Sequence, residues 1–375
     1  MRKILFAHHN IEAHERFSLL VLLLLFVCYF AQPFPFLAAW FGFFVSAYSV
    51  IANDSIQTIG TFLSSNKNHR WWELWLYISC VFFVTLLYSW LYFDGDVSHQ
   101  RLLAKGFEYA PKHFEYLQIA SPIILLVLTW LRIPVSTSFL VLGGFAGSST
   151  AVGRVLFKTF FGYFIAFTLG LITFLALARL TKKIFVGTAS TPWILTQWIV
   201  SGILWSVWLQ QDLANIAVFL PRTLSVAEFS LFAGFIILEL GILLYLKGGR
   251  IQVIVTEKSS VTDPRFATII DAVYAIILYI LKLQNKVPMS TTFVFLGLLS
   301  GREIAMLIRS TSDKDLVATL RMLSKDFAKA VFGLAISIWV ATSVNPNIQI
   351  AQIYDELFVQ IEQFSDGSST LHNAS

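Results

Sequence analysis

Ala52-Asn53-Asp54-Ser55-Ile56-Gln57-Thr58-Ile59-Gly60 is a polar stretch within an apolar segment that runs from about residue 34 to 65. A carboxylate is costly in a lipid bilayer, so Asp54 is expected to face the protein interior or a water-filled cavity. The chain repeats this arrangement at Gln210-Gln211-Asp212-Leu213-Ala214-Asn215, where an Asp again lies in an apolar segment. Residues three apart share one helical face, so each stretch presents a carboxylate and an amide to one point.

The composition indicates a membrane protein with several helical spans. The chain has 375 residues, of which 57% are hydrophobic and only 13% are charged, far from the composition of soluble globular proteins. Cys28 and Cys80 lie in apolar runs and indicate neither a disulfide framework nor a metal site. The net charge of +5 is explained by basic loops that orient a membrane protein, so we expect no nucleic-acid partner.

Apolar segments and the polar stretches between them predict an all-α polytopic membrane protein. The first span covers residues 17–31 and is expected to be retained rather than cleaved as a signal peptide. Residues 34–65 are too long for one simple span, and the polar groups at Asn53-Asp54 predict a broken helix there. Further apolar segments are expected at 71–92, 116–132, 139–147, 156–178, 192–210, 225–246, 266–284, 293–301 and 327–343.

The second half of the chain repeats the first half in the same order. Asp54 and Asp212 are 158 residues apart, and Pro134 and Pro288 are 154 residues apart. Landmarks that recur at nearly one spacing indicate an internal duplication. The predicted organisation is an N-terminal tail with an extra transmembrane helix at 1–33, a first transport repeat at 34–183, a second repeat at 190–343 and a polar tail at 344–375.

Basic residues favour inverted over parallel repeats. If residues 116–150 form a re-entrant hairpin with its tip at 134–138, each repeat crosses the membrane three times and the copies are inverted; four crossings would make them parallel. With the N-terminus cytoplasmic, the hairpin topology puts 17 Lys and Arg inside and five outside. The positive-inside rule therefore favours two inverted repeats, each with a broken helix and a re-entrant helical hairpin. The segments expected inside are 1–16, 66–70, 179–183, 247–265 and 302–326.

Each expected hairpin tip carries a proline followed by hydroxyl side chains. Pro at the first helical position, followed by Ser and Thr, is typical of a helix start, whose free N–H groups suit an anion such as phosphate or sulfate. The alternative is a proline kink whose hydroxyls bond to helix carbonyls. The candidate substrate-binding residues are Ser136, Thr137 and Ser138 in the first tip, Ser290, Thr291 and Thr292 in the second, and the amides Gln57 and Gln211.

The two Asp stretches predict a cation site. Carboxylate and amide oxygens suit Na⁺, and a lone carboxylate can also carry a proton. The alternative is that each Asp pairs with a buried basic residue. Arg132 and Lys286 each lie two residues before a tip proline, where they could neutralise the Asp residues or attract the anion. The candidate cation ligands are Asn53, Asp54, Asp212 and Asn215.

These motifs resemble those of the inorganic phosphate transporter (PiT) family of sodium-dependent phosphate and sulfate permeases. That family carries Gly-Ala-Asn-Asp-x-x-Asn-Ala-x-Gly in each half and Pro-Val-Ser-Thr-Thr-His in each hairpin. The matching segments are 53–60, 212–215, 134–137 and 288–292, within roughly residues 34–343. The motif histidine is replaced by Phe139 and by Phe293, so the resemblance is to a divergent member. It implies sodium at the Asp and amide positions and phosphate at the hairpin hydroxyls.

We therefore expect a multi-pass protein of the cell membrane that transports inorganic phosphate by alternating access, coupled to Na⁺. One alternative is a permease for sulfate or another small oxyanion, with H⁺ as the coupling ion. A second alternative is a receptor or sensor that keeps the transporter fold. An enzyme is not expected, because the spans contain no Ser/His or Cys/His pairing. The expected partners are the anion, the lipid bilayer and, as an option, a second copy of the chain.

Overall fold

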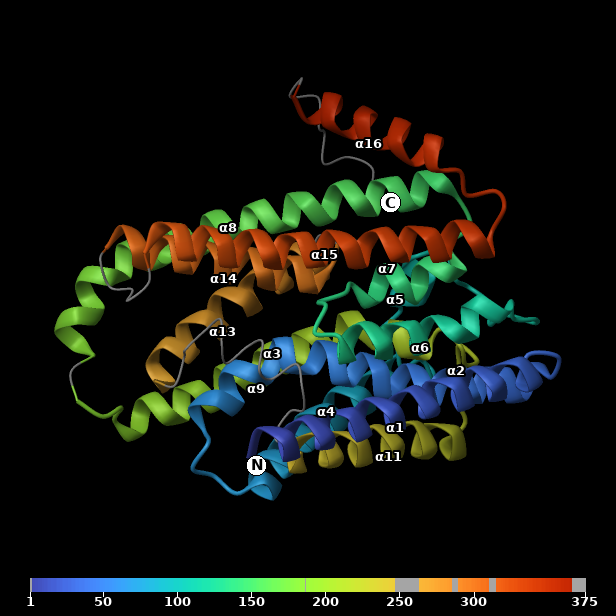
Figure 1. Ribbon diagram of the computed structural model, residues 1–375, viewed down its shortest axis with the longest axis horizontal. Coiled ribbons are helices and arrows are strands. Elements are labelled where there is room, and N and C mark those ends of the chain that lie inside the picture. Colours follow the sequence, from blue (N-terminus) through green and yellow to red (C-terminus); the bar gives the residue numbers. More distant parts are fainter. Residues whose placement is uncertain (1, 186, 247–262, 285–288, 310–314, 366–375) are drawn as a thin grey trace.

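The computed structural model describes residues 2–185, 187–246, 263–284, 289–309 and 315–365, and these residues form helices joined by short loops (Figure 1). No strand occurs in these ranges. The helices are α1 (Arg2–Ala31), α2 (Pro35–Val50), η1 (Ile51–Ser55), α3 (Ile56–Ser65), α4 (Trp71–Tyr92), α5 (Arg101–Ala104), α6 (Tyr116–Trp130), α7 (Thr137–Leu140), η2 (Leu142–Phe145), α8 (Ser149–Ile184), α9 (Thr191–Asp212), α10 (Ala214–Ala217), α11 (Val226–Tyr245), α13 (Pro264–Leu278), η3 (Tyr279–Gln284), α14 (Thr291–Ile308), α15 (Leu316–Val344) and α16 (Ile350–Ser365).

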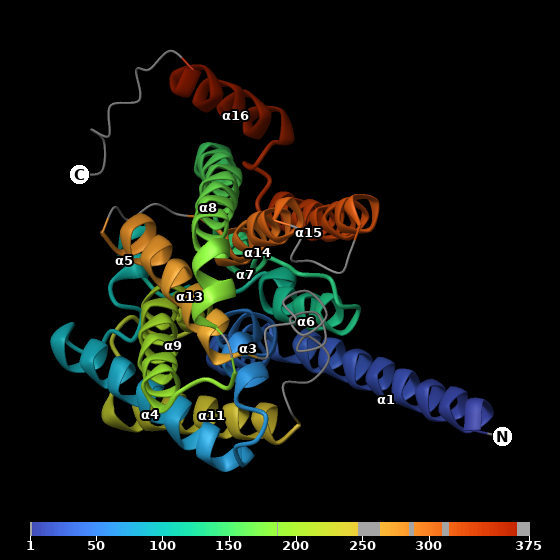
Figure 2. The same ribbon diagram turned by 90° about the vertical axis from the view of Figure 1, so that its left-hand side faces the viewer.

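Nine helices within the described ranges are long and apolar enough to cross a membrane. Helices satisfy their own backbone hydrogen bonds, which is why they are suited to the bilayer interior. Large apolar side chains cover the outside of the bundle, as with Leu19, which is 68% exposed on the peripheral helix α1 (Figure 2). The chain is therefore an all-α, multi-pass membrane protein. The nine spans lie in α1, α2 with η1, α4, α8, α9 with α10, α11, α13 with η3, α14 and α15.

The expected break at Asn53-Asp54 is a π-helical segment instead. The helix α2 continues through η1 directly into α3, so the chain does not unwind at Asp54. The hydroxyl of Ser55 donates to the carbonyl of Ile51, four residues back, a bond that Ser side chains commonly make within helices. In the second half, α9 ends at Asp212 and the one-turn helix α10 begins at Ala214, but Leu213 between them is also in the αR conformation, so the chain does not unwind at Asp212 either. π-Helical segments are frequent at functional sites.

The Ser-Thr residues of both expected tips lie at helix starts; Pro288 itself is outside the described residues. The helix α7 begins at Thr137, and the Ser136 hydroxyl caps it by accepting from the Phe139 N–H. Pro134 thus precedes the cap rather than occupying the first helical position. The helix α14 begins in the same way, with Ser290 as its cap and Phe293 as the donor. The tips touch, since Thr292 Oγ1 donates to the Val135 carbonyl at 3.0 Å.

The helices α8 and α14 pack closely because glycines line their contact. A Cβ added at Gly301 would collide with the carbonyl oxygen of Phe167 on α8, and one at Gly297 would collide with the carbonyl of Tyr163. A Cβ at Gly170 on α8 would lie 2.5 Å from the Leu298 carbonyl oxygen. Small residues four positions apart allow membrane helices to approach to backbone contact, and Gly297 and Gly301 have this spacing.

We expect Gly301→Ala to destabilise the protein by about 1–3 kcal/mol, because overpacking forces α14 away from α8. Gly234→Ala on α11 is the matched control, since a Cβ there would meet nothing within 4 Å. Thermal unfolding in detergent measures both variants. Equal midpoints for Gly301→Ala and the wild type would contradict the close packing.

The C-terminal segment differs from the expected polar tail. Residues 350–365 form the helix α16, which lies against α8 (Figure 1). Arg154 Nε donates to Glu356 Oε1 at 3.0 Å, and the ring of Phe364 packs on Phe161. The charged stretch 302–326 also differs, because α14 extends to Ile308 and α15 already begins at Leu316. The charged residues in these places therefore belong to helices: several on α15 and α16 are exposed, whereas Arg302 and Glu303 on α14 form a buried ion pair.

Candidate functional site

Asp54 lies at the centre of the bundle and is held by the first tip. Thr137 Oγ1 donates to Asp54 Oδ2 at 2.6 Å, and Asn53 Nδ2 donates to Asp54 Oδ1 at 2.6 Å. Asn53 Nδ2 also donates to the carbonyl of Val135 at 2.9 Å. All four residues are at most 2% exposed. The π-helical segment and the tip therefore form one polar unit around this carboxylate.

The same tip joins the two Asp stretches. Thr137 Oγ1 accepts from Asn215 Nδ2 at 2.8 Å while it donates to Asp54. Ser138 Oγ lies 3.2 Å from Asn215 Oδ1 and 3.4 Å from Asp212 Oδ1. Four of the predicted cation ligands and two of the predicted tip hydroxyls thus form one continuous network, although 158 residues separate the two Asp residues in the sequence.

A buried lysine completes the network. Lys282 Nζ lies 3.4 Å from both carboxylate oxygens of Asp212, and both side chains are almost fully buried. Lys282 projects from the π-helical segment η3, just as Asp54 lies in the π-helical segment η1. The sequence prediction missed Lys282, although an ionisable residue inside the apolar run 266–284 was the signal that could have identified it.

The second tip contributes less directly than expected. Ser290 caps α14, and its N–H donates to Thr159 Oγ1 at 3.2 Å. The Thr291 carbonyl accepts from the Tyr274 hydroxyl at 3.1 Å. Thr292 reaches the first tip through the Val135 carbonyl. Ser136 likewise caps its own helix, so Thr137, Ser138 and Thr292 are the tip hydroxyls that link different elements.

Several amide groups beside the network have no hydrogen-bond partner among the described residues. They are Gln57 Nε2, both polar atoms of Gln211, and Asn53 Oδ1. Gln57 is 6% exposed, and Gln211 and Asn53 are fully buried. Buried amides without partners are rare in proteins and costly, so each is available to an ion, a substrate or water. These are three of the amides that the sequence predicted as ligands.

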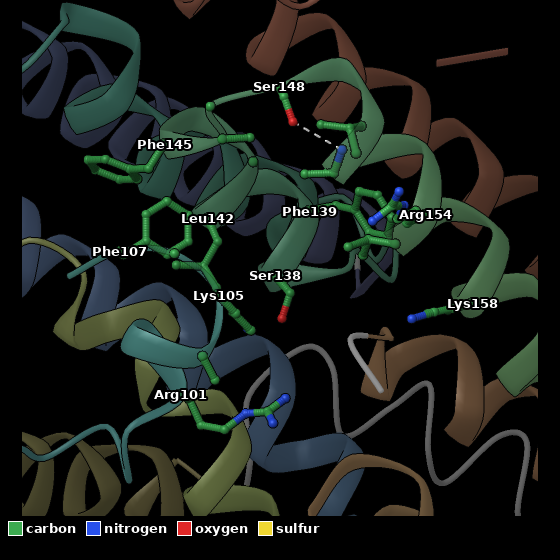
Figure 3. A pocket seen from close by; sticks show the side chains of 18 of the residues that line it. Arg101, Lys105, Phe107, Ser138, Phe139, Leu142, Phe145, Ser148, Arg154 and Lys158 are labelled. Carbon is green, nitrogen blue, oxygen red and sulfur yellow. Dashed lines mark hydrogen bonds between the residues drawn. The ribbon is translucent and has the colours of Figure 1, made fainter. Parts of the chain in front are cut away.

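A cavity of about 580 Å³ reaches this network from one side (Figure 3). Ser138 lies at its inner wall, and Lys282 and Met289 line it as well. Figure 3 shows the side chains of Arg101 and Lys158 directed toward the space beside the Ser138 hydroxyl. Among the described residues that line the cavity there is no carboxylate, but there are five basic side chains: Arg101, Lys105, Arg154, Lys158 and Lys282.

The nearby positive charges affect the pKa of Lys105, which lies in the loop after α5 and lines the cavity. Burial, together with the positive charges of Arg101 and Lys282, holds the pKa of Lys105 well below its ordinary value. Burial also lowers the pKa of Arg101, which donates from Nη1 to the Lys282 carbonyl at 3.2 Å. A bound anion would offset this mutual repulsion. Of the five basic groups, Arg154 pairs with Glu356 and Lys282 pairs with Asp212, so Arg101, Lys105 and Lys158 carry the positive charge of the lining that has no carboxylate partner among the described residues.

Arg132, one of the two basic residues expected to pair with an Asp or to attract the anion, does not pair with either Asp. Arg132 is exposed at the end of α6 with a φ of 58°, whereas Asp54 and Asp212 are buried. The basic partner of Asp212 is Lys282, so Arg132 does not take that role. Lys286 lies outside the described residues. The sequence prediction also missed Arg101 and Lys105, because they belong to a loop of mixed charge with no motif.

Some oxygen atoms of the network are of the kind that bind hard cations. No group of three or more His, Cys, Asp or Glu side chains that could hold a metal occurs in the described part of the chain. Asn53 Oδ1 and Asp54 supply neighbouring oxygens, which suits a hard cation. At Asp212 the ammonium group of Lys282 already occupies the position of a cation. The two Asp residues are therefore not equivalent.

The chain matches no protein-family model, and neither curated proteins nor solved structures match it.

Proposed function

We propose that the protein is an ion-coupled transporter of inorganic phosphate or a closely related tetrahedral oxyanion. The observation that carries this proposal is the cavity, which has five basic side chains, no carboxylate among its described lining residues, and the hydroxyl of Ser138 at its inner wall. Basic side chains and hydroxyls are the donors that oxyanions require. Because the cavity ends at a buried network of charges in a membrane protein, bound anion and coupled ion would interact there.

Two inverted repeats, each with a re-entrant hairpin, are the proposed architecture for alternating access. Contact between the tips at Thr292 and Val135 supports a central site between the repeats. In Figure 1 the end of α3, the end of α8 and the beginning of α15 lie at one end of the molecule, while α5 and the beginning of α8 lie toward the other. This supports the proposed cytoplasmic positions of 66–70, 179–183 and 302–326, and with that orientation the cavity would open outward.

The identity of the anion depends on the hydrogen bonds it can make. Phosphate is the first candidate, because dihydrogen phosphate can donate to a carboxylate as well as accept from Lys and Arg. Sulfate is a specific second candidate, because both Asp carboxylates are already engaged by Thr137 and Lys282 and neither lines the cavity. Without a carboxylate in the lining, phosphate binds better than sulfate only if its P–O–H group donates to a neutral oxygen there, such as Ser138 Oγ.

The coupling ion is proposed to act at the Asp54 side of the network. Asp54 has no basic partner within 4 Å among the described residues, and Asn53 Oδ1 beside it is unpartnered. A sodium ion could take these oxygens, and a proton could take the carboxylate. Asp212 is instead neutralised by Lys282. We therefore propose one coupling-ion site, at Asp54, in place of the two equivalent sodium sites that the family resemblance implies.

Uptake of radiolabelled phosphate by proteoliposomes tests the proposal. We expect accumulation driven by an inward gradient of Na⁺ or H⁺, with unlabelled phosphate competing more strongly than sulfate. The variant Lys158→Gln should lower apparent affinity about ten- to a hundredfold, because it removes a charged donor from the cavity. Lys329→Gln is the matched control, since Lys329 follows the same Lys-x-x-Phe-Gly pattern on α15 but is exposed.

The outcomes separate the candidates. Equal inhibition by sulfate would assign the function to a general oxyanion permease. No uptake of either anion under either gradient would contradict transport. The remaining candidate would then be a receptor or sensor that keeps the transporter fold.

A further inference from the structure

A third intramembrane carboxylate lies away from the cavity and outside the motifs. Asp271 on α13 is 1% exposed and is contacted by hydroxyls from two other helices. Thr61 Oγ1 on α3 donates to Asp271 Oδ1 at 2.5 Å, and Ser201 Oγ on α9 donates to Asp271 Oδ2 at 2.6 Å. These three helices pack directly against one another (Figures 1 and 2).

Asp271 has no counter-charge among the described residues. The charged groups on the helices packed against α13 are engaged elsewhere: Asp212 pairs with Lys282, and Arg302 pairs with Glu303. On α8, Arg154 pairs with Glu356 and Lys158 lines the cavity, while the side chains of Arg179, Lys182 and Lys183 are not described. The helix α3 carries no charged residue. A buried, unpaired carboxylate is costly, so Asp271 needs a bound cation or proton to be neutral.

A polar column leads from Asp271 to the loop at 66–70. The Thr61 carbonyl accepts from the Ser65 hydroxyl at 2.8 Å, and Ser65 in turn accepts from the amide of Gln197. Gln197 Oε1 accepts from Asn66 Nδ2 at 3.0 Å. The next residue, Lys67, is exposed. The column thus connects Asp271 with the end of the molecule opposite to the cavity.

We propose that Asp271 is a proton-binding site on the half of the transport path that faces the 66–70 loop. A hydronium ion on that side gives up a proton and becomes water, the proton forms an O–H bond with one carboxylate oxygen, and the facing hydroxyl of Thr61 or Ser201 then accepts that hydrogen instead of donating. Release reverses the same step. A proton fits better than a metal cation, because the site supplies two carboxylate and two hydroxyl oxygens, whereas hard cations such as Ca²⁺ and Mg²⁺ commonly take about six oxygen ligands.

The inference extends the proposed function, because a proton carried here would couple to the anion, but its first test does not depend on transport. Infrared spectra of the purified protein are recorded across pH 4 to 9, and the spectrum of Asp271→Asn is subtracted. We expect the difference to contain a carboxylic-acid carbonyl band that disappears as the pH rises. Asp355→Asn, at an exposed position on α16, controls for loss of an ordinary surface carboxyl.

Each result decides the proposal. A band whose intensity changes with pH and does not change when Na⁺ is added supports a proton site, and Asp271→Glu should retain such a band. The absence of a pH-dependent band, or a band removed by Na⁺ at constant pH, would overturn the proposal of a proton site. In proteoliposomes, Asp271→Asn should keep anion exchange but lose stimulation by a pH gradient. If the wild type transports neither anion, the proposed function fails while the infrared result still decides the proton site.

Discussion

Replacing Lys282 with Met should lower the free energy of unfolding by about 3–5 kcal/mol, because Asp212 would be left buried without its counter-charge. Asp212→Asn should have an effect of the same sign, since it leaves Lys282 as the unpaired charge. Thermal or denaturant unfolding in detergent micelles measures both. Lys325→Met is the matched control, because Lys325 is exposed on α15.

The double variant Asp212→Asn/Lys282→Met separates the pair from its individual members. Removing both charges leaves no uncompensated ion, so stability should return close to that of the wild type. Anion uptake should stay low, because the cavity has lost Lys282 from its lining. Additive losses of stability in the double variant would mean that the two side chains do not interact as an ion pair.

The sequence predicted the membrane class and most helix positions, because apolar length is a strong signal. The span expected at 71–92 coincides with α4, and the one expected at 225–246 matches α11 to within one residue at each end. The first helix and α15 begin much earlier than expected, since charged residues can extend a helix beyond the bilayer. A π-helical segment has no reliable sequence signal, so η1 was predicted as a break.

At the site, the sequence identified residues whose type is unusual for a membrane segment, namely Asp54, Asp212 and their amide neighbours. Their contacts were not predictable, because Thr137 touches both stretches only after the chain has folded. Lys282 was missed because no repeat or motif marks it. Arg101 and Lys105 were missed for a different reason: they become cavity residues only because the fold brings the segment 101–107 to the same cavity as residues 138–158.

We also expect Asp54→Asn to reduce gradient-driven uptake by about two orders of magnitude while the protein stays folded. The Asn side-chain oxygen can still accept the Thr137 hydrogen bond, so the contact between η1 and the tip is preserved. What is lost is the negative charge that a coupling cation or proton needs. Unlike Asp212, Asp54 is not neutralised by a lysine, so its replacement removes an ion site rather than leaving a partner unpaired.

Two measurements on the same proteoliposomes distinguish loss of coupling from loss of the anion site. Exchange of labelled for unlabelled anion needs the cavity but no net movement of the coupling ion, so Asp54→Asn should retain exchange while losing accumulation. Asp94→Asn provides the control, because Asp94 is exposed and its φ of 49° is one that Asn also tolerates.

Full accumulation by Asp54→Asn would show that the coupling ion binds elsewhere, and Asp271 would then be the next carboxylate to test. Loss of exchange together with accumulation would instead place Asp54 in direct contact with the anion, which its hydrogen bonds to Thr137 and Asn53 argue against.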